Sequence, residues 1–331
     1  MRPLAFSLLR DLSHEHFVSG AKLAEKYGVS RSAVSDALRD ASEAGIGIFS
    51  LTRKGYRLAE PIEVLDVDRI RTALGADAKR VNVEVLTEID STNSELTRRA
   101  LAGAPGGLCL AAETQSAGRG RRGRQWHSAL GSSLTFSLLW RFDRGAAQLG
   151  GLSLVVGLAI LRALQDFGLR DPASVGLKWP NDVVAGNAKL AGVLIETQGD
   201  MLGPTTVIIG IGINVNLSDA LKSNIDQPAT DVAALCDELP SRNRLLARVL
   251  RELVIVLDEF RAAGFGPFKS AWRAHNVLQD KPVRVLFGDG AVVDATVKDV
   301  ADDGTLIVIA KGKELHVTAG EVSLRSAGAK K

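Results

Sequence analysis

The stretch that decides which fold and chemistry to expect is Gly118-Arg119-Gly120-Arg121-Arg122-Gly123-Arg124-Gln125-Trp126. Glycine lets the backbone approach a ligand closely, and arginine offers planar paired donors that suit carboxylate and phosphate groups. The closing tryptophan has a flat face on which an adenine could stack. Four like charges within six residues oppose a compact loop. The pattern therefore predicts a loop that is mobile when empty and ordered only around a negatively charged ligand.

A solvated loop or a nonspecific nucleic-acid patch would have the same composition. The 331 residues carry a formal net charge of only +3, so any nucleic-acid function would have to be local. Hydrophobic residues at 46% and charged residues at 24% describe an ordinary globular protein of two or three domains. The two distant cysteines, with no signal peptide or membrane span, predict a reducing cytoplasm. The scattered histidines predict no metal site.

The first 65 residues have the pattern of a winged helix-turn-helix. Helices are expected at residues 20–27 and 31–44, with Ser30 as N-cap, followed by a hairpin of strands 48–52 and 56–58 with a basic tip. A DNA-binding domain of this kind would present these exposed residues: Arg31, Ser32, Ser35, Arg39, Arg53 and Lys54. A helical dimerisation or docking module is the alternative. The acidic side chains of the second helix favour that alternative: Asp36, Asp40 and Glu43.

Residues 66–278 alternate strands with helices. Strands are expected near 81–86, 108–113, 132–140, 190–196 and 206–215, and helices near 66–74, 94–101, 151–167 and 241–263. From 279 to 326, short strands separated by turns such as Gly288-Asp289-Gly290 predict a small closed β unit. A disordered tail is expected after Arg325.

Four further motifs in the central region carry the chemistry. Asp90-Ser91-Thr92-Asn93 offers hydroxyls and an amide at a helix start, although helix capping alone would use the same residues. Lys178-Trp179-Pro180-Asn181-Asp182 places a fixed cation at the end of a strand, before a turn. Lys189-Leu190-Ala191-Gly192 follows it. Gly210-Ile211-Gly212-Ile213-Asn214 has glycines on alternate strand positions, which favours close approach to the backbone.

Together these motifs resemble the catalytic domain of biotin–protein ligases, and the whole chain resembles the bifunctional ligase–repressors. The resemblance implies an α+β protein. It would comprise an N-terminal winged helix-turn-helix, a central mixed-sheet domain like that of class II aminoacyl-tRNA synthetases, and a C-terminal SH3-like β-barrel. It also implies that biotin and ATP give biotinyl-5′-adenylate, and that a lysine of a biotin carboxyl carrier domain then accepts the biotin. Mg²⁺ would be held mainly by the phosphates, with no protein metal site.

The resemblance assigns roles to residues at matching positions. Lys178 and Arg121 would be catalytic. Biotin would contact Ser91, Thr92, Asn93, Gln115, Arg119, Gly120, Arg121, Lys189, Gly192 and Gly212. The nucleotide would contact Arg121, Arg124, Trp126, Lys178, Asn181 and Asn214. The adenylate would act as corepressor, promoting a change from monomer to homodimer on operator DNA.

Three alternatives remain open from the sequence. A lipoate–protein ligase shares the adenylation-then-transfer logic, although the Lys178–Asp182 motif and the attached winged helix argue against it. A non-catalytic biotin-sensing repressor would not need Lys178. The winged helix could also be vestigial, leaving a biotin ligase alone.

Overall fold

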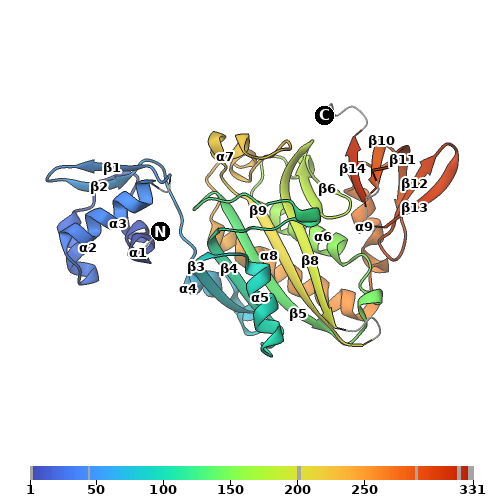
Figure 1. The fold of residues 1–331 in the computed structure, drawn as a ribbon, viewed down its shortest axis with the longest axis horizontal. Coiled ribbons are helices and arrows are strands. Elements are labelled where there is room, and N and C mark those ends of the chain that lie inside the picture. Colours follow the sequence, from blue (N-terminus) through green and yellow to red (C-terminus); the bar gives the residue numbers. More distant parts are fainter. Residues whose placement is uncertain (1–2, 44, 200–202, 288–289, 319–321, 327–331) are drawn as a thin grey trace.

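The structure is a computed structural model that describes residues 3–43, 45–199, 203–287, 290–318 and 322–326. The predicted helix end at Ala44 and the turn at Gly288-Asp289 lie outside the described residues. So does the tail predicted after Arg325, except for Ser326, which ends a strand. Figure 1 shows a small helical unit, a large central sheet and a smaller β unit in succession. The succession confirms the predicted α+β class and order of units. No helix in the described part of the chain has the length and apolar character to cross a bilayer.

The N-terminal unit is a helical core with a hairpin. Its elements are α1 (Pro3–Asp11), α2 (Gly20–Tyr27), α3 (Arg31–Glu43), β1 (Ile48–Leu51) and β2 (Gly55–Leu58). Ser30 Oγ accepts the Ala33 N–H at 3.1 Å, which confirms the predicted N-cap of α3. Leu23, Val34 and Leu38 are buried together between the helices, as their spacing predicts. Helix α1 was not predicted; its buried leucines complete this core.

A seven-stranded mixed sheet forms the centre of the molecule. Its order in the described part of the chain is β3-β4-β5-β9-β8-β7-β6, where β3 and β4 are parallel and the other neighbours are antiparallel. The strands are β3 (Asn82–Ile89), β4 (Leu108–Gln115), β5 (Ser133–Phe142), β6 (Val175–Lys178), β7 (Asp182–Ala185), β8 (Ala188–Gly199) and β9 (Thr205–Asn214). The long predicted strands are confirmed. The short strand β7 was not predicted, because its first residue, Asp182, closes the Lys178–Asp182 motif that reads as a turn.

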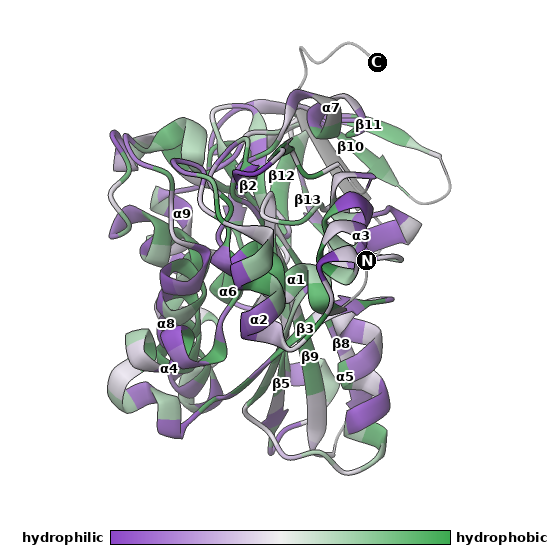
Figure 2. Ribbon diagram, turned by 90° about the vertical axis from the view of Figure 1, so that its left-hand side faces the viewer, coloured by the Kyte–Doolittle hydropathy of each residue, from purple (hydrophilic) through white to green (hydrophobic). Residues whose placement is uncertain are grey.

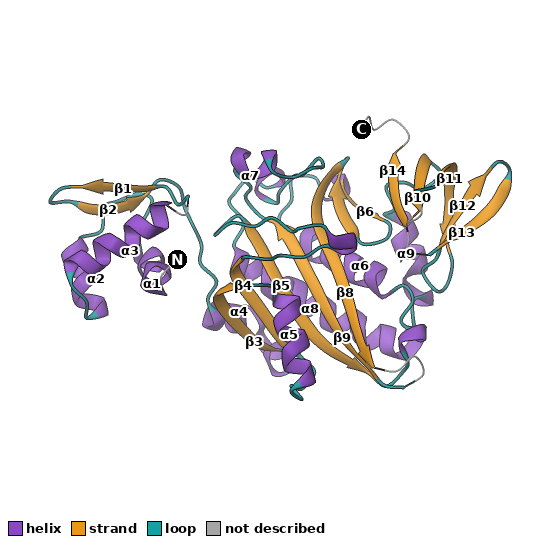
Figure 3. Cartoon of the chain, viewed as in Figure 1, coloured by secondary structure: helices purple, strands orange, loops and turns teal. Residues whose placement is uncertain are grey.

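Helices cover the two faces of this sheet unequally. Helices α4 (Val67–Leu74), α6 (Leu152–Gln165) and α8 (Arg242–Ala263) lie on one face, and α5 (Thr92–Leu101) lies on the other (Figure 3). Helix α6 is buried almost throughout and is predominantly hydrophobic, whereas α8 alternates hydrophilic and hydrophobic residues (Figure 2). Along β5, Phe136 and Leu138 pack into the large core. Ser137 and Leu139 therefore point toward α5. The α5 face, only partly covered, carries the candidate site.

The C-terminal unit is a five-stranded antiparallel sheet of order β13-β12-β11-β10-β14. It follows α7 (Asp219–Ser223) and α9 (Lys269–Ala274) and comprises β10 (Pro282–Phe287), β11 (Val292–Val300), β12 (Leu306–Ala310), β13 (Lys313–Val317) and β14 (Val322–Ser326). Strand β14 was not predicted. No pairing joins β13 to β14 in the described part of the chain. The antiparallel unit is confirmed, and its closure into a barrel stays a prediction.

Candidate active site

A row of paired residues across the sheet forms the floor of the site. Thr135 pairs with Gly212, Gly212 with Gly192, Gly192 with Asp182, and Asp182 with Lys178. Direct partners in antiparallel strands share one face of the sheet. The floor therefore changes along one line from small and neutral residues to a carboxylate and an ammonium group.

One pocket brings together all ten residues predicted to contact biotin. It is lined by Ser91, Thr92, Asn93, Gln115, Arg119, Gly120, Arg121, Lys189, Gly192 and Gly212. Besides Arg121, which was predicted for both ligands, two further predicted nucleotide residues line the same pocket, Trp126 and Asn181. Arg124 lines an adjoining hollow beneath the arginine loop. These motifs lie far apart in the sequence. They converge on one pocket because of the order of the strands in the sheet.

A buried polar group closes the inner end of the pocket. Asn93 Oδ1 lies 2.6 Å from Ser137 Oγ, and Thr92 Oγ1 lies 2.7 Å from the same hydroxyl. Gln115 Oε1 accepts the Thr92 N–H at 2.8 Å, so an amide from β4 caps α5 in place of Ser91. Ser137 is completely buried and was not predicted. The alternation of Thr135 and Ser137 in an otherwise apolar strand was the signal for it.

Gly210 and Gly212 are the sites of close approach that the alternating glycines predict. A Cβ atom at Gly210 would lie 2.1 Å from Asn93 Oδ1, and one at Gly212 would lie 2.4 Å from the Trp126 ring. Trp126 thus lies on the same floor as the residues predicted for biotin. Its indole Nε1 is buried without a hydrogen-bond partner in the described part of the chain. The ring lines the pocket beside Gly192 and Gly212, and its predicted contact with adenine stays a prediction.

The Arg/Gly loop folds as a small hairpin at the mouth of the pocket. Gly118 O accepts the Trp126 N–H at 2.9 Å, and the Gly120 N–H donates to Arg124 O at 2.7 Å. The Arg119 guanidinium pairs with Glu196 of β8, and Arg121 Nη1 donates to Asn181 Oδ1 at 3.0 Å. The protein therefore supplies a counter-charge for Arg119 and a neutral acceptor for Arg121. The predicted ordering of the loop around a bound anion stays a prediction.

Cations and one carboxylate gather at the other end of the floor. Lys189 Nζ lies 2.7 Å from Asp182 Oδ1 and 5.7 Å from the centre of the Trp126 ring. Burial lowers the pKa of Arg121, Asp182 opposes that shift, and Arg122 and Arg124 add to it. Lys178 ends β6 beside Asp182, as the motif predicts. This end suits a phosphate, since positive charges outnumber negative ones.

Two asparagine side chains form hydrogen bonds that join separate parts of the site. Asn181 Nδ2 donates to Val193 O at 2.8 Å, so its Oδ1 is fixed to receive Arg121. Asn214 Nδ2 donates to Lys189 O at 3.1 Å and to Thr230 O at 3.0 Å. That buried amide joins β8 to the segment after α7. Its predicted contact with the nucleotide stays a prediction.

The carboxylate at this end of the site is held by a lysine. Among the described residues, no group of three or more histidine, cysteine, aspartate or glutamate side chains could hold a metal ion. Asp182 is already paired with Lys189. The predicted binding of Mg²⁺ through phosphate groups stays a prediction.

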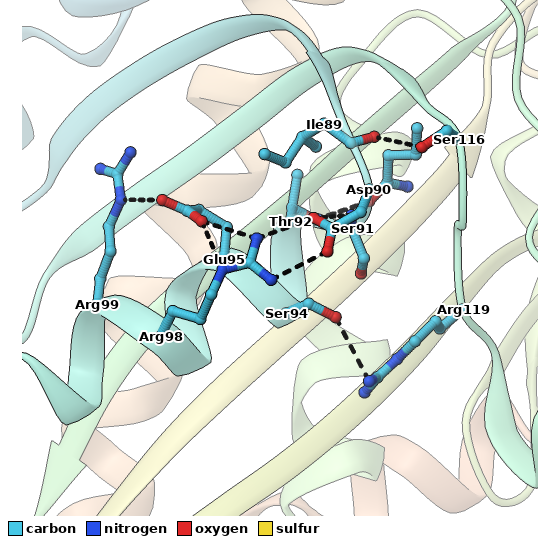
Figure 4. Close-up of polar contacts among 11 residues, drawn as sticks. Ile89, Asp90, Ser91, Thr92, Ser94, Glu95, Arg98, Arg99, Ser116 and Arg119 are labelled. Atoms are coloured by element: carbon cyan, nitrogen blue, oxygen red, sulfur yellow. Dashed lines mark hydrogen bonds and ion pairs between the residues drawn. The ribbon is translucent and has the colours of Figure 1, made fainter.

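An exposed ion cluster supports the turn that precedes Thr92 and Asn93, two members of the buried polar group (Figure 4). Arg98 donates from both terminal nitrogens to Asp90 at 2.9 Å, and Asp90 Oδ1 accepts the Ser91 N–H at 2.7 Å. Asp90 O also accepts the Ala117 N–H at 2.8 Å, so the same turn anchors the start of the arginine loop. The hydrogen bonds from Arg98 hold the pKa of Asp90 at about 2.

We expect Arg98→Ala to return the pKa of Asp90 toward its ordinary value of 3.8. Because the folded pKa lies below the ordinary one, the contribution of Asp90 to stability is present above about pH 4 and is lost as the pH falls toward 2. Carbon NMR titration of the carboxyl measures the shift. Arg99→Ala is the control, since Arg99 pairs with Glu84 and Glu95 instead. An unchanged Asp90 pKa in Arg98→Ala would contradict the assignment.

The residues predicted to contact DNA lie on one small unit and are accessible. Every member of the set is exposed: Arg31, Ser32, Ser35, Arg39, Arg53 and Lys54. Arg53 and Lys54 occupy the turn between β1 and β2. Arg39 pairs with Asp36 at 2.6 Å, which leaves the start of α3 and the hairpin tip as the more basic parts.

Comparison with protein families gives three matches in the order of the structural units. An HTH domain matches residues 5–57, the biotin/lipoate A/B protein ligase family matches 85–214, and the biotin protein ligase C-terminal domain matches 280–325. The structure is similar to that of the Aquifex aeolicus biotin protein ligase in complex with biotin and ATP. The TM-score is 0.62 at 29% identity, covering 74% of this chain and 99% of that one.

Two curated relatives extend the comparison. The biotin–[acetyl-CoA-carboxylase] ligase of Mycobacterium tuberculosis is 35% identical, covering 78% of this chain and 95% of its own. The bifunctional ligase/repressor BirA of Salmonella typhimurium is 36% identical over 321 residues, which cover 97% of each chain. With this identity extending through the winged unit, the chain belongs to the family of bifunctional biotin ligase/repressors.

Proposed function

We propose that this protein is an ATP-dependent biotin–protein ligase that forms biotinyl-5′-adenylate and transfers biotin to a lysine of a carboxyl carrier domain. The convergence of all ten predicted biotin residues on one pocket carries the proposal. The lysine and arginine groups at the far end of its floor support adenylation, which a non-catalytic sensor would not require. The curated relatives named above favour biotin over lipoate as the substrate.

In the first step, a carboxylate oxygen of biotin attacks the α-phosphorus of ATP, and pyrophosphate leaves. Both reactants are anionic, so cations fixed before the reaction lower the barrier. Arg121 is braced by Asn181 and Lys189 by Asp182, which holds both groups in place before substrate enters. Lys178 would neutralise the α-phosphate. Mg²⁺ would enter with the phosphates of ATP and add positive charge there.

In the second step, the neutral amine of a carrier lysine attacks the acyl carbon, and AMP leaves as the amide forms. The nitrogen gives up its proton to solvent or to the departing phosphate. Until then the mixed anhydride must be kept from water, and the hairpin of the arginine loop over the pocket is placed to do so.

Incubation with biotin, Mg-ATP and a biotin carboxyl carrier domain tests the activity. The expected result is a mass increase of one biotinyl group on one lysine of the carrier, dependent on ATP. Lipoate in place of biotin is the matched control for substrate class. Modification by lipoate alone, or none with either acid, would contradict the proposal.

We further propose that the winged unit binds operator DNA as a ligand-promoted dimer, with biotinyl-5′-adenylate as corepressor, in the cytoplasm. Exposure of the six predicted DNA residues supports this proposal. Two helix-turn-helix units on one palindromic site would require two chains. We place the domain boundaries of this proposal at 1–65, 66–278 and 279–326, and the order of the three family matches supports that division.

Removing residues 1–62 should abolish DNA binding and leave adenylate formation. The cut at 62 is chosen because Glu63 O accepts from Arg242, and Glu63 Oε1 accepts from Ser241, which binds the linker to the central domain. Gel shifts on the promoter of biotin-synthesis genes, with biotin and ATP present, measure the loss. A full-length double variant, Arg53→Ala with Lys54→Ala, tests the predicted DNA contacts of the hairpin turn in the same gel shift. No specific shift by the intact protein would favour a vestigial winged unit.

A further inference from the structure

Glu196 joins two parts of the site that lie far apart in sequence. It stands on β8, and its Oε2 accepts Asn93 Nδ2 of α5 at 2.8 Å. Its Oε1 is ion-paired with Arg119 Nη2 of the arginine loop. Arg119 Nη1 also reaches Ser94 Oγ, at 3.4 Å (Figure 4). The Glu196 carboxylate therefore contacts both Asn93, at the inner end of the pocket, and the arginine loop at its mouth.

The contact with Asn93 fixes the direction of a buried amide. A carboxylate only accepts hydrogen bonds, so the amide nitrogen of Asn93 must face Glu196 and the amide oxygen must face Ser137. The absence of a side chain at Gly210 gives the amide its space. Asn93 Nδ2 also donates to Leu194 O at 3.4 Å, so Glu196, which makes the shorter contact, and Leu194 O together fix how the amide faces a ligand.

The contact with Arg119 bears on closure of the loop. Arg119 and Glu196 are both partly exposed, with 44% and 32% of their side chains accessible. Such a pair is modest in strength and is weakened by salt. Together with the bond from Arg121 to Asn181, it joins the loop to β8 and to the turn between β6 and β7.

We propose that Glu196 is a positioning residue that both orients Asn93 and latches the arginine loop, and thereby sets how long the adenylate is retained. The inference rests on the proposed biotin ligase function. Release of the adenylate requires the loop to open, so weakening the latch speeds release without removing any group that touches the reacting atoms.

Two substitutions separate the two contacts. Glu196→Gln keeps an oxygen that can accept from Asn93 but removes the charge that pairs with Arg119. Glu196→Ala removes both contacts and leaves the buried Asn93 donor poorly satisfied. We expect Glu196→Gln to raise the rate of adenylate release about 2- to 5-fold with an unchanged KM for biotin. We expect Glu196→Ala to raise that KM roughly 10-fold as well.

Limited trypsin digestion tests whether the Arg119–Glu196 pair holds the arginine loop closed, and it does not depend on enzyme activity. Cleavage between Gly118 and Trp126 in ligand-free protein should be about 2- to 5-fold faster in Glu196→Gln than in the unmodified chain. Added salt should narrow that difference, because it screens the pair only where the charge is present. Asp258→Asn is the matched control. It breaks the pair between Asp258 of α8 and Arg80, whose side chains are 39% and 44% exposed, and should change neither cleavage nor release.

The outcomes distinguish this inference from the proposed function. Equal cleavage and equal release in Glu196→Gln and the unmodified chain would overturn the latch. A KM for biotin that rises as much in Glu196→Gln as in Glu196→Ala would overturn the separate roles of the two contacts. Failure of the unmodified chain to make adenylate would reject the proposed function, whereas the cleavage test would still report on the latch.

Discussion

Lys178→Met should reduce the rate of adenylate formation about 100- to 1000-fold while leaving biotin affinity largely intact. Lys178 ends β6 at the charged end of the floor, where it is the strand partner of Asp182 across the β6–β7 ladder. The buried polar group of Thr92, Asn93 and Ser137 lies at the other end of the pocket. Its charge is needed most when negative charge builds up around the α-phosphate. Rapid-quench measurement of pyrophosphate release, with separate titration of biotin binding, gives the two quantities.

Lys178→Arg is the charge-preserving companion to this variant. Arginine keeps the positive charge but changes its shape and reach, so we expect a rate between those of Lys178→Met and the unmodified chain. Lys269→Met, which removes a lysine paired with Asp302 outside the pocket, should leave the rate unchanged. Pyrophosphate release by Lys178→Met at nearly the unmodified rate would contradict the catalytic assignment.

The parts of the fold that the sequence predicted are those with strong local signals. The helix α8 and strands β5 and β9 follow from long periodic runs, and the end of α2 follows from Gly28, which adopts φ 63°. The site motifs were predicted because their residue types are unusual together. Neither kind of signal requires knowledge of which strands are neighbours.

The residues that the sequence missed depend on neighbours distant in the chain. Ser137 becomes a site residue only because β5 lies beside β9 and beneath the start of α5. Glu196 acts at a distance of 103 positions from Asn93 and 77 from Arg119. The predicted repulsion within the arginine loop omitted that carboxylate. The position of Trp126 likewise follows from a fit against Gly212 that no local pattern encodes.

A buried ion pair behind the site underlies the prediction with the largest effect on stability. Glu113 of β4 and Arg242 of α8 lie 2.8 Å apart, with side chains 1% and 2% exposed. Arg242 also donates to Ser133 O and Glu63 O, and Glu113 accepts the Leu65 N–H. The pair therefore joins β4, β5, α8 and the linker from the winged unit. Gln115, which caps α5 in the pocket, follows Glu113 by two residues on the same strand.

Glu113→Gln should lower the free energy of unfolding of the central domain by about 3–5 kcal/mol, because it leaves the Arg242 charge buried without a counter-ion. Urea unfolding followed by tryptophan fluorescence measures the change. The double variant Glu113→Gln with Arg242→Met should recover much of the loss, since no unpaired charge remains. Asp302→Asn, which breaks the exposed pair with Lys269, should cost less than about 1 kcal/mol. A similarly small loss in Glu113→Gln would show that solvent or other groups satisfy Arg242, and that the pair is not what fastens the linker to the sheet.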